Sequence, residues 1–317
     1  MAPPRLLHLA GAALAAFAVT AAAAQPFTGC PSADIASAFA DFGPSGRMPP
    51  ALRRWVNDRA AQRVEPFKAF DDAYFVGVCW VSAWLLPTPQ GHFLIDTLHE
   101  PHSTELLANI REAGFDPQDI RYVLVTHGHY DHAGGMARLK KELKNARFVM
   151  TAAGWAEARA SVAADAGTPS AWRTIPRDIV ASDGDAWTLG GRTVTLLATP
   201  GHTLGTASYL YEVHDGTRAY RAVTIGGIGI DASLIDPYIA SVERLDRLVG
   251  ERPPVEVHLP THPFVTGLME HRTELARHTV TDPHPLVDRK GLHRLLGELE
   301  VGARERLDIE RAKEAPK

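Results

Sequence analysis

The chain has little cysteine, no cluster of positive charge and few long apolar segments. These are the features of cysteine-based zinc sites, nucleic-acid-binding proteins and membrane-spanning proteins. Cysteine occurs only at Cys30 and Cys79 in 317 residues. Two thiols cannot supply a cysteine-based zinc site, so any bound metal ion needs histidines and carboxylates. The formal net charge is -4, and no block of Lys and Arg stands out, which argues against nucleic acid as a partner. After residue 24 no apolar run is long enough to span a bilayer.

The two cysteines allow two interpretations. In an oxidising compartment Cys30 and Cys79 can pair. Cys79 lies in the apolar stretch 75–80, and this placement favours a buried free thiol. Lipid attachment at Cys30 is disfavoured because residues 27–29 are a poor lipidation signal. The distance between the two residues in the fold decides between a disulfide and a free thiol.

The first 24 residues have the pattern of a cleaved signal peptide. Arg5 gives a positive start, residues 9–24 form an almost unbroken apolar run, and the alanines at 22–24 suit signal peptidase. The alternative is a membrane anchor, but the run has about 16 residues and a span needs roughly 20. We therefore expect a periplasmic or secreted protein without stable membrane insertion, whose mature chain begins near Gln25.

The rest of the sequence predicts an N-terminal extension, residues 25–72, followed by one α/β domain, residues 73–317. The extension is rich in proline, with one helix expected over 51–63. Short apolar strands then alternate with amphipathic helices, without a repeat or a low-complexity linker. The predicted strands cover 76–78, 81–86, 93–95, 122–125, 147–150, 187–189, 193–198, 206–211, 220–225 and 255–259, and the predicted helices 103–113, 133–143, 241–248 and a stretch from about 289.

Four potential metal ligands fall within the segment THGHYDHAGG, residues 126–135. His127 and His129 alternate in a loop directly after an apolar strand, so an extended chain directs both at one point. Asp131 and His132 open the next helix, where they turn toward a second point. Because a single strand or helix cannot direct all four side chains onto one ion, the spacing indicates two metal ions.

This segment resembles the HxHxDH signature of the metallo-β-lactamase superfamily. The resemblance extends over about Ala73 to Pro285, since residues 93–96 (FLID), 199–203 (TPGHT) and 262–263 (HP) follow in the family's order. It implies an α/β fold, the αβ/βα four-layer sandwich, with the metal ions at one edge of the paired sheets.

The resemblance also implies a role for each matching residue. Two Zn²⁺ ions are expected, the first held by His127, His129 and His202 and the second by Asp131, His132 and His262. Asp96 and Thr203 would orient these ligands, with a simple strand-end cap as the alternative for Asp96. His258 is the competitor for the last ligand position, but strand alternation turns it away from the expected metal edge. Trp80 and Trp84 alternate with apolar residues and are predicted to lie in the core.

The stretch 224–228 distinguishes the branches of the family. Cysteine-ligand β-lactamases place a Cys after a Gly-Gly pair here, and glyoxalase-type and lactonase-type relatives place a bridging Asp, whereas this chain has Gly227. The sequence is therefore most similar to the class B, subclass 3 enzymes. The serine that often helps bind the substrate carboxylate in that subclass is replaced by Ile228, which predicts weak binding of β-lactams.

In the resembled family a zinc-activated water is the nucleophile and Asp131 would be the catalytic residue that orients it. The absence of a Gly-x-Ser-x-Gly pattern agrees with this chemistry. We expect a β-lactamase that acts on a small molecule. The alternatives are another hydrolase of this fold, acting on a lactone, an ester or a phosphoester, and a non-catalytic zinc-binding protein.

Overall fold

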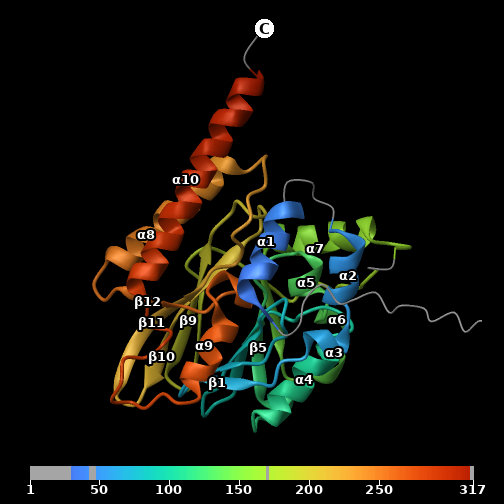
Figure 1. The fold of residues 1–317 in the computed structure, drawn as a ribbon. Coiled ribbons are helices and arrows are strands. Elements are labelled where there is room, and N and C mark those ends of the chain that lie inside the picture. The colour runs from blue at the N-terminus through green and yellow to red at the C-terminus, as the bar shows by residue number, and fades with distance from the viewer. Residues whose placement is uncertain (1–29, 43–47, 169–170, 315–317) are drawn as a thin grey trace, which may run out of the picture.

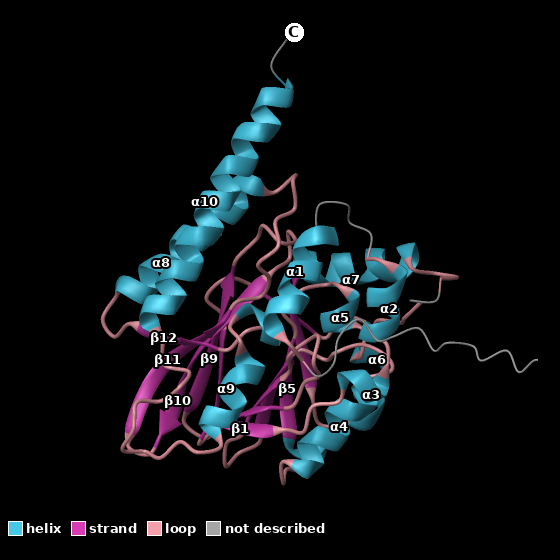
Figure 2. Ribbon diagram, in the orientation of Figure 1, coloured by secondary structure: helices cyan, strands magenta, loops and turns pink. Residues whose placement is uncertain are grey.

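The protein folds into two β-sheets that face each other, with helices on both outer sides (Figure 1, Figure 2). This computed structural model describes residues 30–42, 48–168 and 171–314. The predicted signal peptide and the expected mature start at Gln25 lie outside the described residues. The observed order of layers, helices, sheet, sheet, helices, confirms the αβ/βα sandwich expected from the sequence.

The first sheet has seven strands in chain order, β1 to β7. Strands β1 to β4 pair antiparallel, and β4 to β7 pair parallel. The parallel part needs crossover segments, and helices α4 to α7 supply them on one outer face. The strands are β1 (Phe67–Phe70), β2 (Ala73–Phe75), β3 (Trp84–Leu86), β4 (His92–Ile95), β5 (Ile120–Leu124), β6 (Arg147–Thr151) and β7 (Ile179–Ala181). The helices are α4 (Ser103–Glu112), η2 (Pro117–Asp119), α5 (Tyr130–Ala133), α6 (Met136–Glu142) and α7 (Ala152–Ala164).

The second sheet has the order β12-β11-β10-β9-β8. Its strands are antiparallel except for β11 and β12, which helix α8 joins in parallel. The long helix α10 packs along α8 on the outer face of this sheet (Figure 1). The elements are β8 (Ala186–Leu189), β9 (Arg192–Ala198), β10 (Ala207–Asp215), β11 (Arg218–Thr224), α8 (Ile235–Gly250), β12 (Val255–His258), η3 (Pro263–Val265), α9 (Leu268–Leu275) and α10 (Arg289–Glu314).

The N-terminal segment is part of the folded body. It forms α1 (Ser32–Phe42), α2 (Pro50–Val56), α3 (Arg59–Gln62) and the edge strand β1, which pairs with β2. The single helix predicted over 51–63 is wrong, because the carboxylate of Asp58 accepts hydrogen bonds from the backbone N–H groups of Ala60 and Ala61 and starts a second helix.

Cys30 and Cys79 form a disulfide with their Cα atoms 5.4 Å apart. Of the two interpretations that the sequence leaves open, the structure therefore shows the disulfide and not the buried free thiol. The pairing closes a separation of 49 residues and ties the start of α1 to the loop between β2 and β3.

Two predicted elements near this loop also differ from the structure. Residues 76–83 form a tight loop in place of two strand segments, because the buried amide of Asn109 donates to the carbonyl oxygens of Val76 and Gly77. The helix predicted over 133–143 begins earlier and is split into α5 and α6. At the break, a Cβ atom on Gly135 would lie 2.2 Å from the carbonyl oxygen of Thr97, so this close approach requires glycine.

No helix in the described ranges is long and apolar enough to cross a membrane. Among the described helices only α10, with 26 residues, exceeds the roughly 20 residues that a membrane span needs. It carries charged side chains along its whole length.

Candidate functional site

Three connections at one edge of the paired sheets carry the predicted ligands. The β5–α5 connection carries His127 and His129, and Asp131 and His132 follow in α5. His202 lies in the turn between β9 and β10, and His262 follows β12. The structure therefore brings together the six residues that the sequence singled out, as two groups. We call them the first triad (His127, His129, His202) and the second triad (Asp131, His132, His262).

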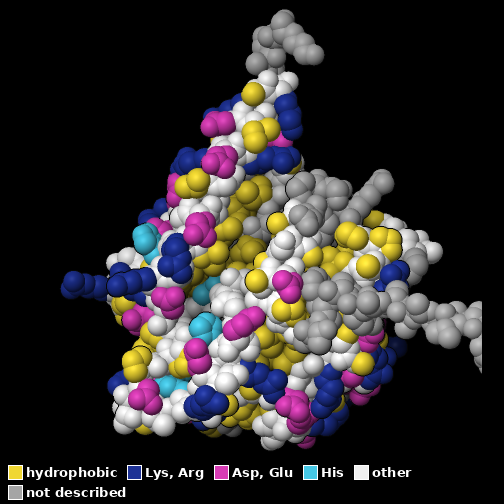
Figure 3. Space-filling view, in the orientation of Figure 1, with side chains coloured by type: hydrophobic (Ala, Val, Ile, Leu, Met, Phe, Trp, Pro, Cys, Tyr) yellow, Lys and Arg dark blue, Asp and Glu magenta, His cyan; other side chains and the backbone are white. Residues whose placement is uncertain are grey.

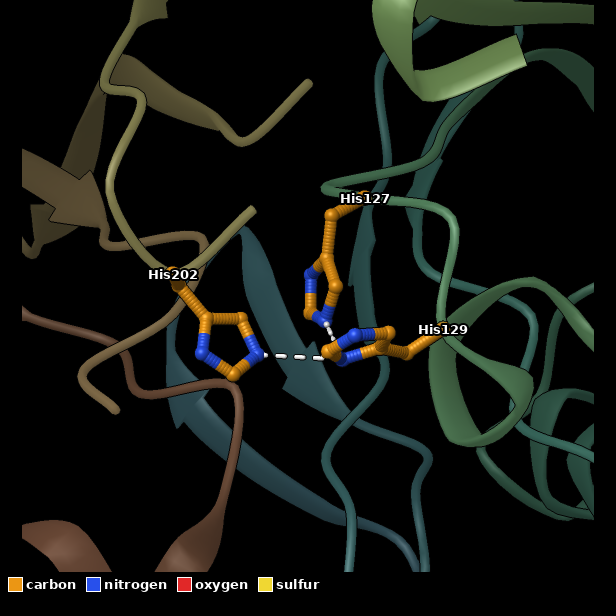
Figure 4. A group of neighbouring side chains, drawn as sticks. All are labelled: His127, His129 and His202. Carbon is orange, nitrogen blue, oxygen red and sulfur yellow. Dashed lines mark hydrogen bonds between the residues drawn. The ribbon is translucent and has the colours of Figure 1, made fainter. Parts of the chain in front are cut away.

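In the first triad the three imidazole rings converge on one space (Figure 4). The His129 Nδ1 atom lies 3.1 Å from His127 Nε2 and 3.1 Å from His202 Nε2. The rings come from two separate connections of the chain, so the fold creates this convergence.

The second triad is equally compact. His132 Nε2 lies 3.3 Å from His262 Nε2, and the Oδ2 atom of Asp131 lies 3.5 Å and 3.6 Å from these two nitrogens. Two imidazoles and a carboxylate make a ligand set that zinc accepts.

Hydrogen bonds on the outer side of the rings fix which nitrogen faces each site. His202 Nδ1 donates to the carbonyl oxygen of Gly229 at 2.9 Å, and His262 Nδ1 donates to the carbonyl oxygen of Trp80 at 2.7 Å. A carbonyl oxygen only accepts, so each Nδ1 carries the proton and each Nε2 presents a lone pair. Lone pairs that face one another at such short distances repel unless a cation lies between them. The two triads therefore fit a metal centre.

Asp96 fixes His132 in the same way. Its Oδ2 atom accepts from His132 Nδ1 at 2.8 Å, while its Oδ1 atom accepts from the backbone N–H of Thr126 at 2.8 Å. Asp96 is buried and has a φ of 64°, a left-handed conformation that is rare outside glycine. The carboxylate thus joins the end of β4 to the loop that carries the first triad, and it does more than cap a strand.

Thr203 has a different role from the one expected. Its Oγ1 atom donates to Glu157 Oε2 at 2.8 Å, and its backbone N–H donates to Thr206 Oγ1 at 2.9 Å. These contacts hold the β9–β10 turn in shape, and within the described ranges the Thr203 side chain makes no hydrogen bond to a triad imidazole.

Burial and crowding set the pKa values of the triad histidines. Burial, together with the neighbouring imidazoles, lowers the pKa of His127 far below its usual value, that of His202 to about 3 and that of His262 to about 4. These rings are neutral near pH 7 and can bind a metal ion through their lone pairs.

The carboxylate of Asp131 stays ionised. Burial alone raises its pKa, but four surrounding histidines outweigh burial and hold the pKa well below the usual range. For His132 burial acts in the opposite direction and lowers the pKa. The carboxylates of Asp131 and Asp96 outweigh burial and raise the pKa of His132 above its usual value. The second triad therefore contains the ionised carboxylate of the centre.

Sequence reasoning missed two residues of the site. Trp80 is not simply a core side chain, because its Nε1–H donates to Asp131 Oδ2 at 3.2 Å and its ring lines the cleft above both triads. Trp80 is buried in the core as predicted, but alternation along residues 76–83, which form a loop, could not indicate its contact with Asp131. Glu157 in α7 accepts from Thr203 Oγ1 and from the N–H of Gly205 at 2.7 Å, and no motif marks it. Trp84 lies in the core, as predicted.

Gly227 faces the first triad with no room for a side chain. A Cβ atom there would lie 2.4 Å from the His202 ring. The imidazole of His202 thus occupies the space that a Cys or Asp ligand at position 227 would need.

His258 lies outside both triads. Its ring nitrogens are buried and have no hydrogen-bond partner in the described part of the chain, and they line a separate cavity of about 290 Å³ beside α10. The alternation of β12 therefore separates His258 from His262, as the strand geometry predicts.

Comparisons with known proteins agree with this geometry. A sequence model of the Metallo-beta-lactamase superfamily matches residues 76–262, which is more than half of the chain. The fold is similar to that of BJP-1, a subclass B3 metallo-β-lactamase of Bradyrhizobium japonicum, with 26% identity and a TM-score of 0.71 over 84% of this chain and 100% of that chain. It is also similar to a metallo-β-lactamase of Cronobacter sakazakii, with 27% identity and a TM-score of 0.68 over 83% and 94% of the two chains.

A curated relative points to another activity within the same fold. A hydroxyacylglutathione hydrolase of Yersinia pestis is 30% identical over 141 residues, 44% of each chain, so this chain spans under half the length of that relative. The fold, the two triads and the extent of the family match lead to one conclusion: the chain belongs to the metallo-β-lactamase superfamily, and its structure is similar to subclass B3 enzymes of that superfamily.

Proposed function

We propose that the protein is an exported hydrolase that binds two zinc ions and opens the β-lactam ring. The observation that carries this proposal is the pair of triads, whose lone pairs face inward at one sheet edge of a subclass B3-like fold. The first triad would hold one zinc ion and the second triad the other.

The chain's own residues prepare the site for attack by water. Bound zinc supplies a water of lowered pKa and polarises the scissile carbonyl. Asp131 remains ionised, and the Trp80 indole holds its Oδ2 atom, which leaves Oδ1 to orient the attacking water. Asp96 keeps the His132 ring in the tautomer that presents Nε2 to the site. No side-chain nucleophile is required.

Hydrolysis of a chromogenic cephalosporin and of a carbapenem by the zinc-loaded protein tests the proposal. We expect turnover that a chelator abolishes and that added zinc restores, because the five imidazoles and one carboxylate act only through bound metal. A protein that turns over neither compound, but cleaves a lactone or a phosphodiester with the same chelator sensitivity, would assign the alternative hydrolase activity.

A second candidate function is hydrolysis of a hydroxyacylglutathione, which the curated relatives favour by name. The structure provides an argument against it. Glyoxalase-type relatives are expected to carry a bridging Asp at the position of Gly227, and here the His202 ring fills that space. Assay of the same zinc-loaded sample with a hydroxyacylglutathione separates the two candidates.

Ile228 lines the cleft where a polar anchor for the substrate carboxylate is expected. We predict that Ile228→Ser lowers the Michaelis constant for a cephalosporin by about tenfold or more, since one hydrogen bond to a charged group contributes roughly 1.5–3 kcal/mol. Steady-state kinetics measure the effect, and an unchanged Michaelis constant with a lower kcat would contradict it.

We also propose export with cleavage before Gln25. The disulfide supports it, since disulfides persist in oxidising compartments. The intact mass of the protein recovered from the periplasm checks the prediction. A mass that retains residues 1–24 would refute cleavage, and recovery only from the cytosol would refute export.

A further inference from the structure

The cleft above the two triads has an apolar outer wall. Its volume is about 900 Å³, large enough for a drug-sized molecule. Figure 3 shows hydrophobic side chains along the flank of α10 that faces α1. The large apolar residues that line the cleft are Phe39, Met48, Trp80, Ile228, Ile230 and Phe264. This wall suits the apolar body of a substrate whose reactive bond lies over the triads.

One lysine or arginine lines this cleft among the described residues, and it comes from the far end of the chain. Arg306 lies in the last third of α10, three residues after the fully buried Ala303 and next to the half-buried Leu307. Residues three and four apart share one face of a helix. Arg306 is therefore on the face that packs against the body, and Leu307 joins the same apolar cluster as Ile228 and Ile230.

The guanidinium of Arg306 contacts one acidic side chain through Nε and keeps its other donors available. Its Nε atom lies 2.7 Å from Glu310 Oε1 one helical turn on. Its two terminal amino groups donate no hydrogen bond within the described part of the chain, and the ion pair with Glu310 is made through Nε. A guanidinium held at Nε still presents a fork of donors that matches a carboxylate, sulfonate or phosphate group.

The acidic groups of the cleft already have partners. Asp231 accepts hydrogen bonds from the backbone N–H and the hydroxyl of Ser233, and Asp131 accepts from Trp80. Neither is paired with Arg306, and the side chain of Ile228 cannot bind an anion. The terminal nitrogens of Arg306 are the donors that this wall offers to a negatively charged ligand.

We infer that Arg306 is a specificity-determining residue that binds an anionic group on an amphipathic substrate and takes over the role left vacant at Ile228. The substrate has an apolar body against the wall of the cleft and an anionic group at Arg306. The identity of that substrate as a β-lactam rests on the proposed function, whereas the preference for an amphipathic anion rests on the cleft itself.

Kinetics with an acid and its neutral ester test the inference. In the zinc-loaded protein, Arg306→Ala should raise the Michaelis constant for a cephalosporin acid about tenfold, because a hydrogen-bonded charge pair is lost, and leave that for its methyl ester unchanged. Arg306→Lys should recover part of the difference. The matched control is Arg304→Ala, which removes the same charge from α10. Arg304 pairs with Glu300 and Glu243, so its replacement should change neither Michaelis constant more than about twofold.

A binding measurement keeps the two proposals separable. Fluorescence titration with anilinonaphthalenesulfonate, an apolar ring system with one sulfonate, needs no turnover, and N-phenylnaphthylamine is the neutral control. Arg306→Ala should weaken binding of anilinonaphthalenesulfonate about tenfold and leave binding of N-phenylnaphthylamine unchanged. If no β-lactam is hydrolysed but this difference holds, the β-lactamase assignment fails and the anion site stands. If Arg306→Ala affects acid and ester, or sulfonate and neutral probe, equally, the inference about Arg306 is wrong.

Discussion

Replacement of His262 by alanine is expected to remove the metal ion of the second triad and most of the activity. His262 provides one of the three protein ligands of that triad, and its Nε2 lone pair is held inward by the hydrogen bond from Nδ1 to the carbonyl of Trp80. Loss of a residue that hydrogen-bonds to a metal ligand lowers metal affinity or activity by about 10- to 100-fold. Loss of the ligand itself should lower both by more. We expect zinc content to fall from about two to about one per chain, as measured by elemental analysis.

His258→Ala is the matched control for this prediction. His258 is a half-buried histidine like His262 and lies four residues earlier in the chain, but it lines a cavity outside both triads. Its replacement should leave zinc content and the Michaelis constant near those of the natural protein. Loss of zinc from His258→Ala together with its retention in His262→Ala would show that the last ligand has been assigned to the wrong histidine.

Asp96→Asn should weaken zinc binding at the second triad by about 10- to 100-fold, as expected for the outer partner of a ligating histidine. The two carboxylate oxygens of Asp96 accept from His132 Nδ1 and from the N–H of Thr126. An amide has one accepting oxygen, so its NH₂ group must face one of these two donors. Asparagine tolerates the left-handed backbone of position 96, so the variant tests the carboxylate and not the turn. Competition with a chromophoric zinc chelator measures the affinity.

Thr203→Val provides the comparison for Asp96→Asn. Thr203 lies beside His202 in sequence but bonds Glu157 and Thr206, so its loss should lower thermal stability with little change in zinc affinity. If Thr203→Val weakens zinc binding as much as Asp96→Asn does, orientation of the ligands depends on the β9–β10 turn more than on the carboxylate.

The four ligands of one segment could be predicted from the sequence because their information is local, whereas His202 and His262 are reached only through the resemblance to the metallo-β-lactamase superfamily. His127, His129, Asp131 and His132 lie within six residues, and their spacing relative to one apolar strand already separates two ligand groups. The strand pattern around His258 and His262 carried the same kind of information, since two-residue alternation and Pro260 decide which side chain reaches the sheet edge.

The outer part of the site could not be predicted because its residues meet only through tertiary packing. Trp80 and Asp131 are 51 residues apart, and Glu157 and Thr203 are 46 apart. Arg306 reaches the cleft because α10 packs along α8. Residue periodicity along the chain does not report such contacts. For Trp80 it predicted burial in the core, which the structure confirms, but not the contact with Asp131.

The bond between Cys30 and Cys79 has a practical consequence for anyone who produces this protein. It holds the start of α1 beside Trp80, and α1 contributes Phe39 to the cleft. Cross-linking a loop of about 50 residues stabilises the folded state by roughly 4 kcal/mol in the chain-entropy model. In a reducing host cell that bond does not persist. A recombinant sample from such a host would keep all six predicted zinc ligands, but α1 would no longer be fixed beside the cleft. Its substrate preferences would therefore differ from those of the oxidised protein.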